Sequence, residues 1–367
     1  MSATQAIDLE DAEGLLAADR AGLLRAASNA GAQVRAIAAA HAEGELDSMR
    51  GGERPRSVIW VAGRGTAETA GVMLTSTLGA AAAAPIALVT EAPPWIGPLD
   101  VLIVAGDDPG DPALISAAAT GVRRGARVVV VAEYEGPLRD STAGRVAVLE
   151  PRVWVPDEFR LCRYLAAGLA VLQTVDPRLP IDVATLADQL DAETLCNSAA
   201  REVFTNPAKT LAARVLDAQA ALAGDSAATL ALARHGSSVL LRIAQRVVAA
   251  GGLADAVAAL RAAAELGDSG NAADALFHDE EIDGPLPRRL RVLALTLAGE
   301  RTVVAARVAG LNDVYLVAAD DVPELPDALG GATGLSVPAA AASAEQQLAV
   351  LAVRLEMAAV YLRLVRG

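Results

Sequence analysis

Acidic side chains follow two apolar segments of strand length, and they are the residues best placed to do chemistry. Asp107, Asp108 and Asp111 follow the first segment, and Glu133 and Glu135 follow the second. Carboxylate oxygens suit a divalent cation such as Mg²⁺, and a basic partner would also fit them. A phosphate would be repelled, since two like charges about 4 Å apart interact by roughly 4 kcal/mol at an effective dielectric constant near 20. Capping of helix N-termini at a solvated rim is the simpler interpretation, and we favour it.

A second candidate site is a glycine-containing turn after the apolar residues 57–62. It consists of Gly63, Arg64, Gly65 and Thr66. Glycine lets the backbone approach a phosphate group, and the N-terminus of a following helix offers free N–H groups. The Arg64 guanidinium could add a bidentate contact to an anion. A tight turn from strand to helix with no ligand explains the same residues equally well.

Hydrophobic periodicity places both candidate sites at the ends of strands. Residues 99–132 contain an apolar strand, a turn, an amphipathic helix over 112–124 and a second apolar strand, which together make one βαβ unit. Short apolar runs predict five strands, at 57–62, 86–90, 101–105, 127–132 and 146–149. We therefore predict a doubly wound parallel sheet, which binds its ligands at the carboxyl ends of the strands.

The remaining pattern predicts flanking helices and a second sheet. Helices are expected at 12–42 and 159–175, with a proline-containing linker at 176–186. The second half is expected to contain helices at 186–204, 207–223, 238–250 and 344–364 and strands at 229–233, 290–295 and 314–318. The predicted fold class is α/β, with two doubly wound parallel-sheet domains related by duplication and flanked by N- and C-terminal helices.

Four segments follow from this division. They are an N-terminal helical segment at 1–52, a first domain at 53–178, a linker and helix at 179–200, and a second domain with the C-terminal helix at 201–367.

Composition excludes several classes of partner. The formal charge is −14 and the pI is near 4.7, whereas nucleic acids and anionic membranes require a basic surface. The apolar runs are too short to span a membrane, and no leader pattern is present, so we expect a cytoplasmic protein that binds neither membrane nor nucleic acid. Cys162 and Cys196 lack the spacing of a disulfide framework or a zinc site. We expect no cofactor and no bound metal.

Four stretches of sequence carry a resemblance to a known family. They are SVIWVAGRGTAETAG, LDVLIVAGDDPGDPALISAAATGVRRGARVVVV, VPDEFRLCRYLAAGLAVL and NPAKTLA. In order and spacing they resemble the tandem sugar isomerase (SIS) domain proteins of the bifunctional phosphoglucose and phosphomannose isomerase family. The resemblance runs from about residue 54 to the C-terminus. It implies two SIS-like domains, a sugar-phosphate ligand and a homodimer.

The resemblance also assigns candidate roles to single residues. The turn 63–66 matches the family's phosphate-binding turn, and Lys209 lies in the matching NPAK segment, where a structural role is favoured over a catalytic one. Arg160 matches an arginine that could polarise the sugar ring oxygen or a hydroxyl, and a salt bridge to Asp157 or Glu158 is its alternative role.

Aldose to ketose isomerisation needs a base and a ring-opening acid. His278, with Glu280 close by, resembles the family's histidine segment and is the candidate acid. An acidic surface loop would have the same composition.

Several departures from the family pattern favour binding over catalysis. The family's second loop is rich in serine and threonine, but here it carries Asp107 and Asp108. No carboxylate is found near Ala249 or Ala250, where the family has its base, and the C-terminal lysine is missing. His235 could substitute, or it could cap or pack.

We therefore expect a carbohydrate-derivative binder, sensor or scaffold with weak or lost catalysis. One alternative is an active isomerase of glucose 6-phosphate or mannose 6-phosphate. The other alternative is a metal-dependent enzyme that uses the acidic loops.

Overall fold

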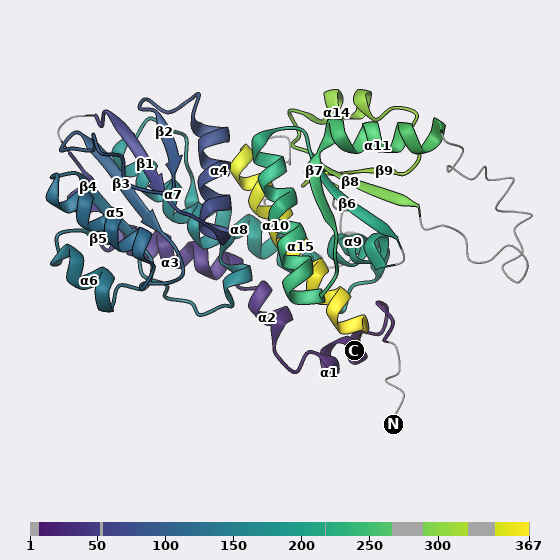
Figure 1. The fold of residues 1–367 in the computed structure, drawn as a ribbon. Coiled ribbons are helices and arrows are strands. Elements are labelled where there is room, and N and C mark those ends of the chain that lie inside the picture. The colour runs from purple at the N-terminus through teal and green to yellow at the C-terminus, as the bar shows by residue number, and fades with distance from the viewer. Residues whose placement is uncertain (1–6, 52–53, 217, 266–288, 322–341, 367) are drawn as a thin grey trace, which may run out of the picture.

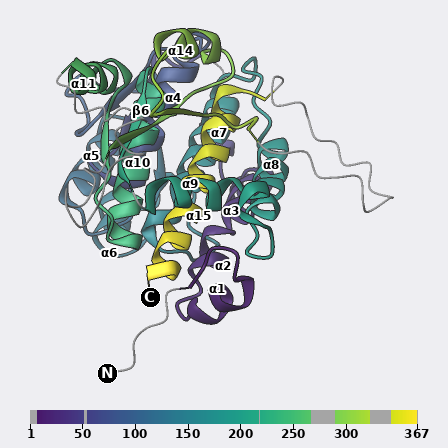
Figure 2. The same ribbon diagram turned by 90° about the vertical axis from the view of Figure 1, so that its right-hand side faces the viewer.

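The computed structural model contains two parallel β-sheets, and helix α15 (Ala344–Arg366) runs between them (Figures 1 and 2). The structure describes residues 7–51, 54–216, 218–265, 289–321 and 342–366 of the chain. Both sheets carry helices on both faces, so the predicted α/β fold class is confirmed. None of the helices in the described residues is long and apolar enough to cross a membrane.

The first sheet has five parallel strands in the order β2-β1-β3-β4-β5. They are β1 (Ser57–Val61), β2 (Ile86–Val89), β3 (Asp100–Ala105), β4 (Arg127–Val131) and β5 (Ala147–Val148). All five predicted strands are confirmed to within two residues at each end. Strand order reverses between β1 and β3, so the turns that follow these two strands lie at the point where a ligand can enter such a sheet.

Alternate residues of each strand face opposite layers of helices. On the inner face Val58, Trp60 and Ile103 pack with helices α3 (Ala30–Ala42), α4 (Gly65–Leu78) and α7 (Leu161–Val175). On the outer face Ile59 and Val104 pack with α5 (Pro112–Arg123) and α6 (Gly136–Thr142). A strand covered on both faces is apolar throughout, which explains the continuous apolar runs of the sequence.

The N-terminal segment is not the single helix predicted at 12–42. It forms α1 (Ala12–Ala18), α2 (Leu23–Ala27) and α3. The break arises because the Asp19 carboxylate accepts hydrogen bonds from the backbone N–H groups of Leu23 and Leu24, at 2.8 and 2.9 Å. An aspartate that satisfies the free N–H groups of a new helix competes with continuation of the old one.

A long connection leads from the first sheet to the second. It contains the 3₁₀ helix η2 (Asp157–Phe159), α7, α8 (Val183–Cys196), η3 (Val203–Thr205) and α9 (Pro207–Leu216). Another 3₁₀ turn, η1 (Asp47–Met49), precedes β1. The predicted helices at 159–175 and 186–204 correspond to α7 and α8, and α8 begins and ends earlier than predicted.

The second sheet has four parallel strands in the order β7-β6-β8-β9. They are β6 (Gln219–Gly224), β7 (Ala249–Gly252), β8 (Leu290–Leu295) and β9 (Val314–Val317). Its strand order repeats that of the first four strands of the other sheet. Helices α9, α10 (Ala227–Ala244) and α15 cover the inner face, and α11 (Leu253–Glu265) and α14 (Arg301–Arg307) cover the outer face.

Three predictions in this half were wrong. The predicted helix at 207–223 ends at Leu216, and β6 follows it. The predicted strand at 229–233 lies inside α10, and the predicted helix at 238–250 ends at Ala244 before β7. The strand sequences QAALAG and AAGG contain no β-branched residue, so local propensity does not indicate a strand. Pairing within the buried sheet overrides that propensity.

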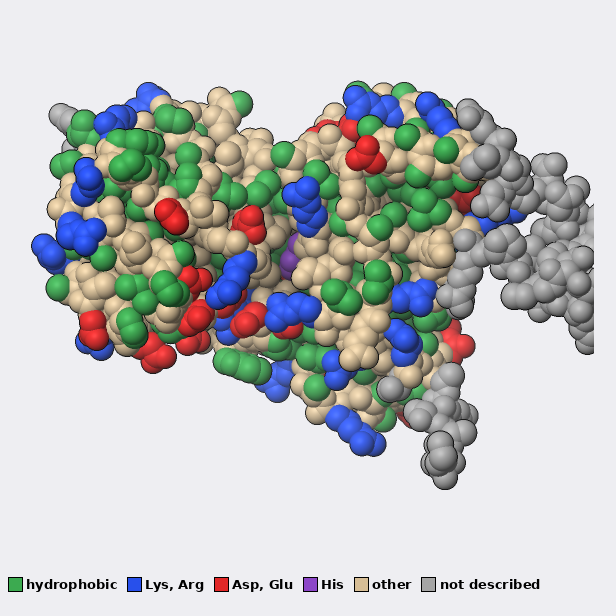
Figure 3. Space-filling view, viewed as in Figure 1, with side chains coloured by type: hydrophobic (Ala, Val, Ile, Leu, Met, Phe, Trp, Pro, Cys, Tyr) green, Lys and Arg blue, Asp and Glu red, His purple; other side chains and the backbone are tan. Residues whose placement is uncertain are grey.

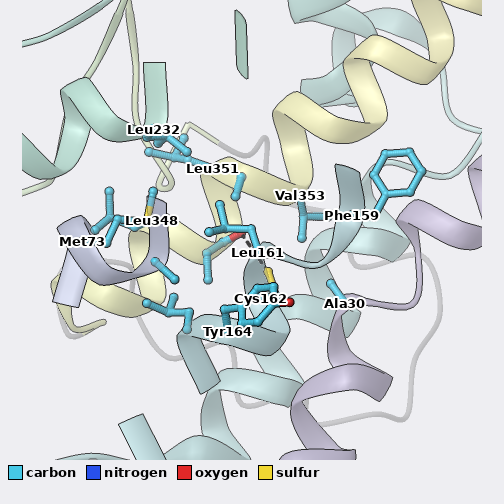
Figure 4. Packing of buried hydrophobic residues seen from close by; sticks show 14 of the residues in the cluster. Ala30, Met73, Phe159, Leu161, Cys162, Tyr164, Leu232, Leu348, Leu351 and Val353 are labelled. Carbon is cyan, nitrogen blue, oxygen red and sulfur yellow. Dashed lines mark hydrogen bonds between the residues drawn. The ribbon is translucent and has the colours of Figure 1, made fainter. Parts of the chain in front are cut away.

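One apolar core joins the two halves of the molecule. It lies between the inner faces of the sheets and includes residues of α3, α4, α7, α10 and α15. Figure 4 shows side chains from these helices packed together, among them Met73, Tyr164, Leu232, Leu348 and Leu351. Helix α15 is buried along most of its length because neighbours from both halves surround it.

A buried ion pair anchors α15 to α8. Arg354 and Glu193 are 1% and 4% exposed, and two guanidinium nitrogens of Arg354 donate to the Glu193 carboxylate at 2.9 and 3.1 Å. The same guanidinium donates to the carbonyls of Ala318 and Ala319. Burial alone would lower the pKa of Arg354, but Glu193 holds that pKa above its ordinary value. The Arg354 guanidinium stays charged because Glu193 and two backbone carbonyls accept its hydrogen bonds.

Replacement of Glu193 by alanine should destabilise the protein by about 3–5 kcal/mol, because it leaves the buried Arg354 charge unpaired. The melting temperature of the purified variant measures this loss. Asp188→Ala is the matched control, since its partner Arg35 is on the surface and the pair is solvent-exposed. Removal of that pair should cost less than about 1 kcal/mol. Equal losses for the two variants would contradict the role of the buried pair.

Candidate functional site

The turn after β1 ends in the first turn of α4. Gly65 has φ +69°, a left-handed conformation that favours glycine, and α4 begins at this residue. Among the described residues no side chain caps this helix, so the first backbone N–H groups of α4 have no side-chain acceptor. Thr66 is 7% exposed at this end, and the Thr69 hydroxyl donates to the Gly65 carbonyl at 3.1 Å. The uncapped end is an attractive environment for an anion.

The turn after β3 is tied to the start of α7 through Asp107. Its Oδ1 accepts a hydrogen bond from Arg160 Nη1 at 3.0 Å and another from the Tyr164 hydroxyl at 2.6 Å. Burial raises the pKa of Tyr164, so the phenol remains a donor at neutral pH. The second guanidinium nitrogen of Arg160 lies 3.2 Å from Asp157, which is one of the two partners expected from the sequence.

The other two aspartates of this turn accept hydrogen bonds from backbone N–H groups and lie close to Arg64. Asp111 accepts from the Ala113 N–H at 2.9 Å, and Asp108 accepts from the Gly110 N–H at 2.8 Å. The Arg64 guanidinium lies 3.4 Å from Asp111 and 3.9 Å from Asp108. Helix capping, the favoured interpretation of these residues, is what Asp111 does at α5.

The acidic edge is therefore compensated by arginines of neighbouring turns. Asp107 faces Arg160, and Asp108 and Asp111 face Arg64, so each aspartate has a cation within 4 Å. In the described part of the chain, no three His, Cys, Asp or Glu side chains gather closely enough to hold a metal ion.

A cleft of about 190 Å³ lies beside this edge, between the two halves of the molecule. One wall is the N-terminal half of α4, with Gly65, Thr66, Glu68, Thr69 and Val72. The other wall is α10, and Glu158 closes one side. Figure 3 shows a hollow between the two lobes, with basic and acidic side chains along it. Packing of α4 against α10 forms this cleft, so neither half contains it alone.

Polar residues at helical spacing line the α10 wall. They are the adjacent Arg234 and His235, then Ser238 and Arg242 at further steps of three and four residues, which places them on one face of the helix. Arg242 bridges the two halves, since its Nη2 lies 2.8 Å from Glu158 Oε1. Arg234 is exposed and makes no ion pair with any described residue. Its charge is available to a ligand in the cleft.

A buried histidine and glutamate pair lies at the α10 wall. His235 lines the cleft, and its Nε2 is 2.9 Å from Glu356 Oε1 of α15. The two residues are 4% and 1% exposed. Burial raises the pKa of Glu356, and His235 opposes part of that shift.

The other predicted site residues are distributed as follows. Gly63, Arg64, Gly65 and Thr66 lie in the turn after β1, and the last two line the cleft. Lys209 lies away from the cleft, where its fully buried ammonium donates to the carbonyls of Ala199 and Arg201, at 2.8 Å each. His278 and Glu280 lie outside the described residues.

Sequence reasoning missed Arg234, Arg242 and Glu356. The wrongly predicted strand at 229–233 divided α10 and hid the periodicity of its polar face. Glu356 and Arg354 had a readable signal, because charged residues inside the apolar stretch of residues 348–362 must find buried partners. Their partners, His235 and Glu193, are more than a hundred residues away, so the pairing itself was not readable.

No protein-family model matches the chain, and no curated protein matches it. Solved structures do share its fold. Tagatose-6-phosphate ketose/aldose isomerase from Escherichia coli superposes with a TM-score of 0.56 at 15% identity, over 94% of this chain and 90% of that one. A glucose-6-phosphate isomerase like protein from Thermus thermophilus has a TM-score of 0.53 at 18% identity, over 98% and 96%. The C-terminal domain of glucosamine-fructose-6-phosphate aminotransferase from Francisella tularensis has a TM-score of 0.55 at 10% identity, over 96% of each chain. The chain therefore has the α/β fold of these phosphosugar isomerase structures, with two parallel sheets, as the sequence resemblance implied.

Tyr164→Phe should lower stability by about 1–2 kcal/mol, because it removes a hydrogen bond to the Asp107 carboxylate and keeps the ring. Thermal unfolding of the purified variant measures the loss. Tyr315→Phe serves as the control, since that ring packs against Arg214 and Arg291 and its hydroxyl has no hydrogen-bond partner among the described residues. An unchanged melting temperature for Tyr164→Phe would show that the hydroxyl does not hold the turn.

Proposed function

We propose that this protein binds a phosphorylated sugar in the cleft between α4 and α10. The observation that carries the proposal is the meeting of three anion-attracting groups across one small cleft. They are the uncapped N-terminus of α4, the exposed Arg234 and the half-exposed Arg242. A phosphate group fits such a combination because helix N–H groups and guanidinium groups both donate to its oxygens.

The charge balance of the cleft supports an anionic ligand. Glu68 and Glu158 also line it, but Glu158 is already paired with Arg242. Arg234 and the positive end of the α4 dipole are left to oppose Glu68. The acidic turn after β3 does not exclude phosphate from this position, because Arg64 and Arg160 compensate its carboxylates.

The remaining polar groups suit the sugar portion. Ser238 and Thr69 carry hydroxyls on opposite walls, and Glu68 offers carboxylate oxygens that accept hydrogen bonds from sugar hydroxyls. Structural neighbours whose names refer to tagatose 6-phosphate, glucose 6-phosphate and fructose 6-phosphate support the same class of ligand. We propose a sugar phosphate as the ligand of this chain and single out no particular sugar.

Binding with weak or lost turnover is the form of the proposal that we favour. Helix α10, which follows the first strand of the second sheet, carries no carboxylate. An active aldose–ketose isomerase acting on glucose 6-phosphate or mannose 6-phosphate is the second candidate. The observation that favours it is the carboxylate of Glu356, which reaches His235 from α15 instead.

Cytoplasmic location and a homodimer remain part of the proposal. The C-terminal helix α15 offers no face for such a dimer, because it is buried between the two sheets of its own chain. Self-association would have to use other apolar residues, and light scattering at micromolar concentration tests it.

Arg234→Gln should weaken binding of glucose 6-phosphate or mannose 6-phosphate by about tenfold or more, since a charge-assisted hydrogen bond contributes about 1.5–3 kcal/mol. Isothermal titration measures the dissociation constants, with unphosphorylated glucose as the ligand control. Arg261→Gln is the protein control, because Arg261 is an exposed arginine on α11, away from the cleft. The proposal falls if the protein binds neither phosphorylated sugar, or if both variants bind as well as the unaltered chain.

A further inference from the structure

One ring nitrogen of His235, Nδ1, takes no part in the buried pair with Glu356. Nε2 of His235 is engaged with Glu356 Oε1 at 2.9 Å, whereas Nδ1 has no hydrogen-bond partner in the described chain. Nδ1 is not among the fully buried side-chain atoms without a partner, so this nitrogen keeps some exposure to solvent. Because His235 also lines the cleft, its remaining small exposure places Nδ1 within reach of a ligand there.

Glu356 has features that suit an orienting carboxylate. It is buried inside α15, and His235 is its hydrogen-bond partner. An ionised carboxylate on Nε2 keeps the proton on that nitrogen, leaves Nδ1 as the basic nitrogen and stabilises the imidazolium that forms when Nδ1 accepts a proton. The same arrangement of a base oriented by a buried acid recurs in unrelated enzymes.

We propose that His235 is the proton-transfer group of this cleft and that Glu356 positions it, with an anionic α-hydroxycarbonyl compound as substrate class. This inference rests on the proposed function, because it places a reaction where the phosphorylated sugar is proposed to bind. It uses His235, which the sequence analysis named as a substitute for the missing base, in place of His278 and Glu280, which lie outside the described residues. It also supplies the carboxylate that α10 lacks.

The reaction is a proton shift between neighbouring carbons. Nδ1 takes the proton from the carbon next to the carbonyl, and the electron pair of that C–H bond remains on the substrate as an enediolate. The imidazolium then returns the proton to the former carbonyl carbon, while the hydroxyl proton passes to the other oxygen. No further reactant is consumed.

Several ionisable groups lie around His235. Arg234 and Arg242 lie on its own helix, Glu68 lies on α4, and Glu158 lies on η2. On the side of α7, the Cys162 thiol senses the charge of Glu356, and burial raises the thiol's pKa well above its ordinary value. Cys162 therefore stays neutral, and Glu356 is the acidic group in direct contact with the imidazole.

The test is solvent deuterium exchange into glucose 6-phosphate, mannose 6-phosphate and fructose 6-phosphate, followed by proton NMR in D₂O. The unaltered protein should incorporate deuterium at the transferred position of at least one of them. His235→Gln should lower that rate by about 100-fold or more, the usual contribution of a positioned base. Its affinity for the same sugar phosphate should change little. His41→Gln is the control, because that histidine contacts Thr174 away from the cleft.

Glu356→Gln distinguishes positioning from general stability. Loss of the carboxylate removes the group that orients the imidazole and stabilises its protonated form, so the rising limb of the exchange rate should move to lower pH and its plateau should fall. A purely structural role would reduce the amount of folded protein and leave the shape of the pH profile unchanged. An unshifted profile therefore removes Glu356 from the mechanism.

Failures of the two proposals are separable. A protein that binds the sugar phosphates but exchanges none overturns the role of His235 and leaves the binding proposal intact. If none of them binds, the proposed function fails. The tautomer of the His235 ring then tests the role of the His235–Glu356 pair independently of ligand binding. Long-range proton–nitrogen NMR at neutral pH, assigned with His235→Gln, should find the proton on Nε2 and none on Nδ1. The opposite tautomer would overturn the proposal.

Discussion

Both sheets bury their inner faces against one shared layer of helices, and α15 lies at the centre of that layer. Because this helix is surrounded by apolar neighbours from both halves, each polar side chain on it needs a partner that is fixed in space. Arg354 finds Glu193 and two backbone carbonyls, and Glu356 finds His235. The first pair ties α15 to α8, and the second pair ties it to α10. The requirement to satisfy buried charge thereby sets the position of the helix wall that lines the cleft.

The acidic turn after β3 shows how misleading charge can be when it is counted along a sequence. Three aspartates within five residues predict a strongly negative edge. In the folded chain their neighbours across the edge are Arg64 and Arg160, which arrive from two other turns. Like charges that are close in sequence repel less than expected when arginines lie among them. The site that remains attractive to an anion lies beside this edge.

The first sheet was predictable because its strands are rich in valine and isoleucine and each is followed by a clear turn. The second sheet was harder, because β6 and β7 consist largely of alanine and glycine, whose local preference is not for strands. The turn at 63–66 could be located from its glycines. The cleft could not, since it depends on the packing of α4 against α10, and the misassigned strand at 229–233 divided the polar face of α10. Pairs such as His235 with Glu356 arise only from the tertiary fold.

Trp60 gives the cleft a natural optical probe. Its indole N–H donates to the Ala67 carbonyl in the first turn of α4 at 3.1 Å, and its ring packs so closely on Gly71 that a Cβ there would lie 2.7 Å from it. The chain's other tryptophans, Trp95 and Trp154, are 53% and 79% exposed. Emission from the buried indole should therefore lie at shorter wavelength and resist a water-soluble quencher. Any movement of the first turn of α4 would be reported by this intrinsic fluorescence, with no dye attached.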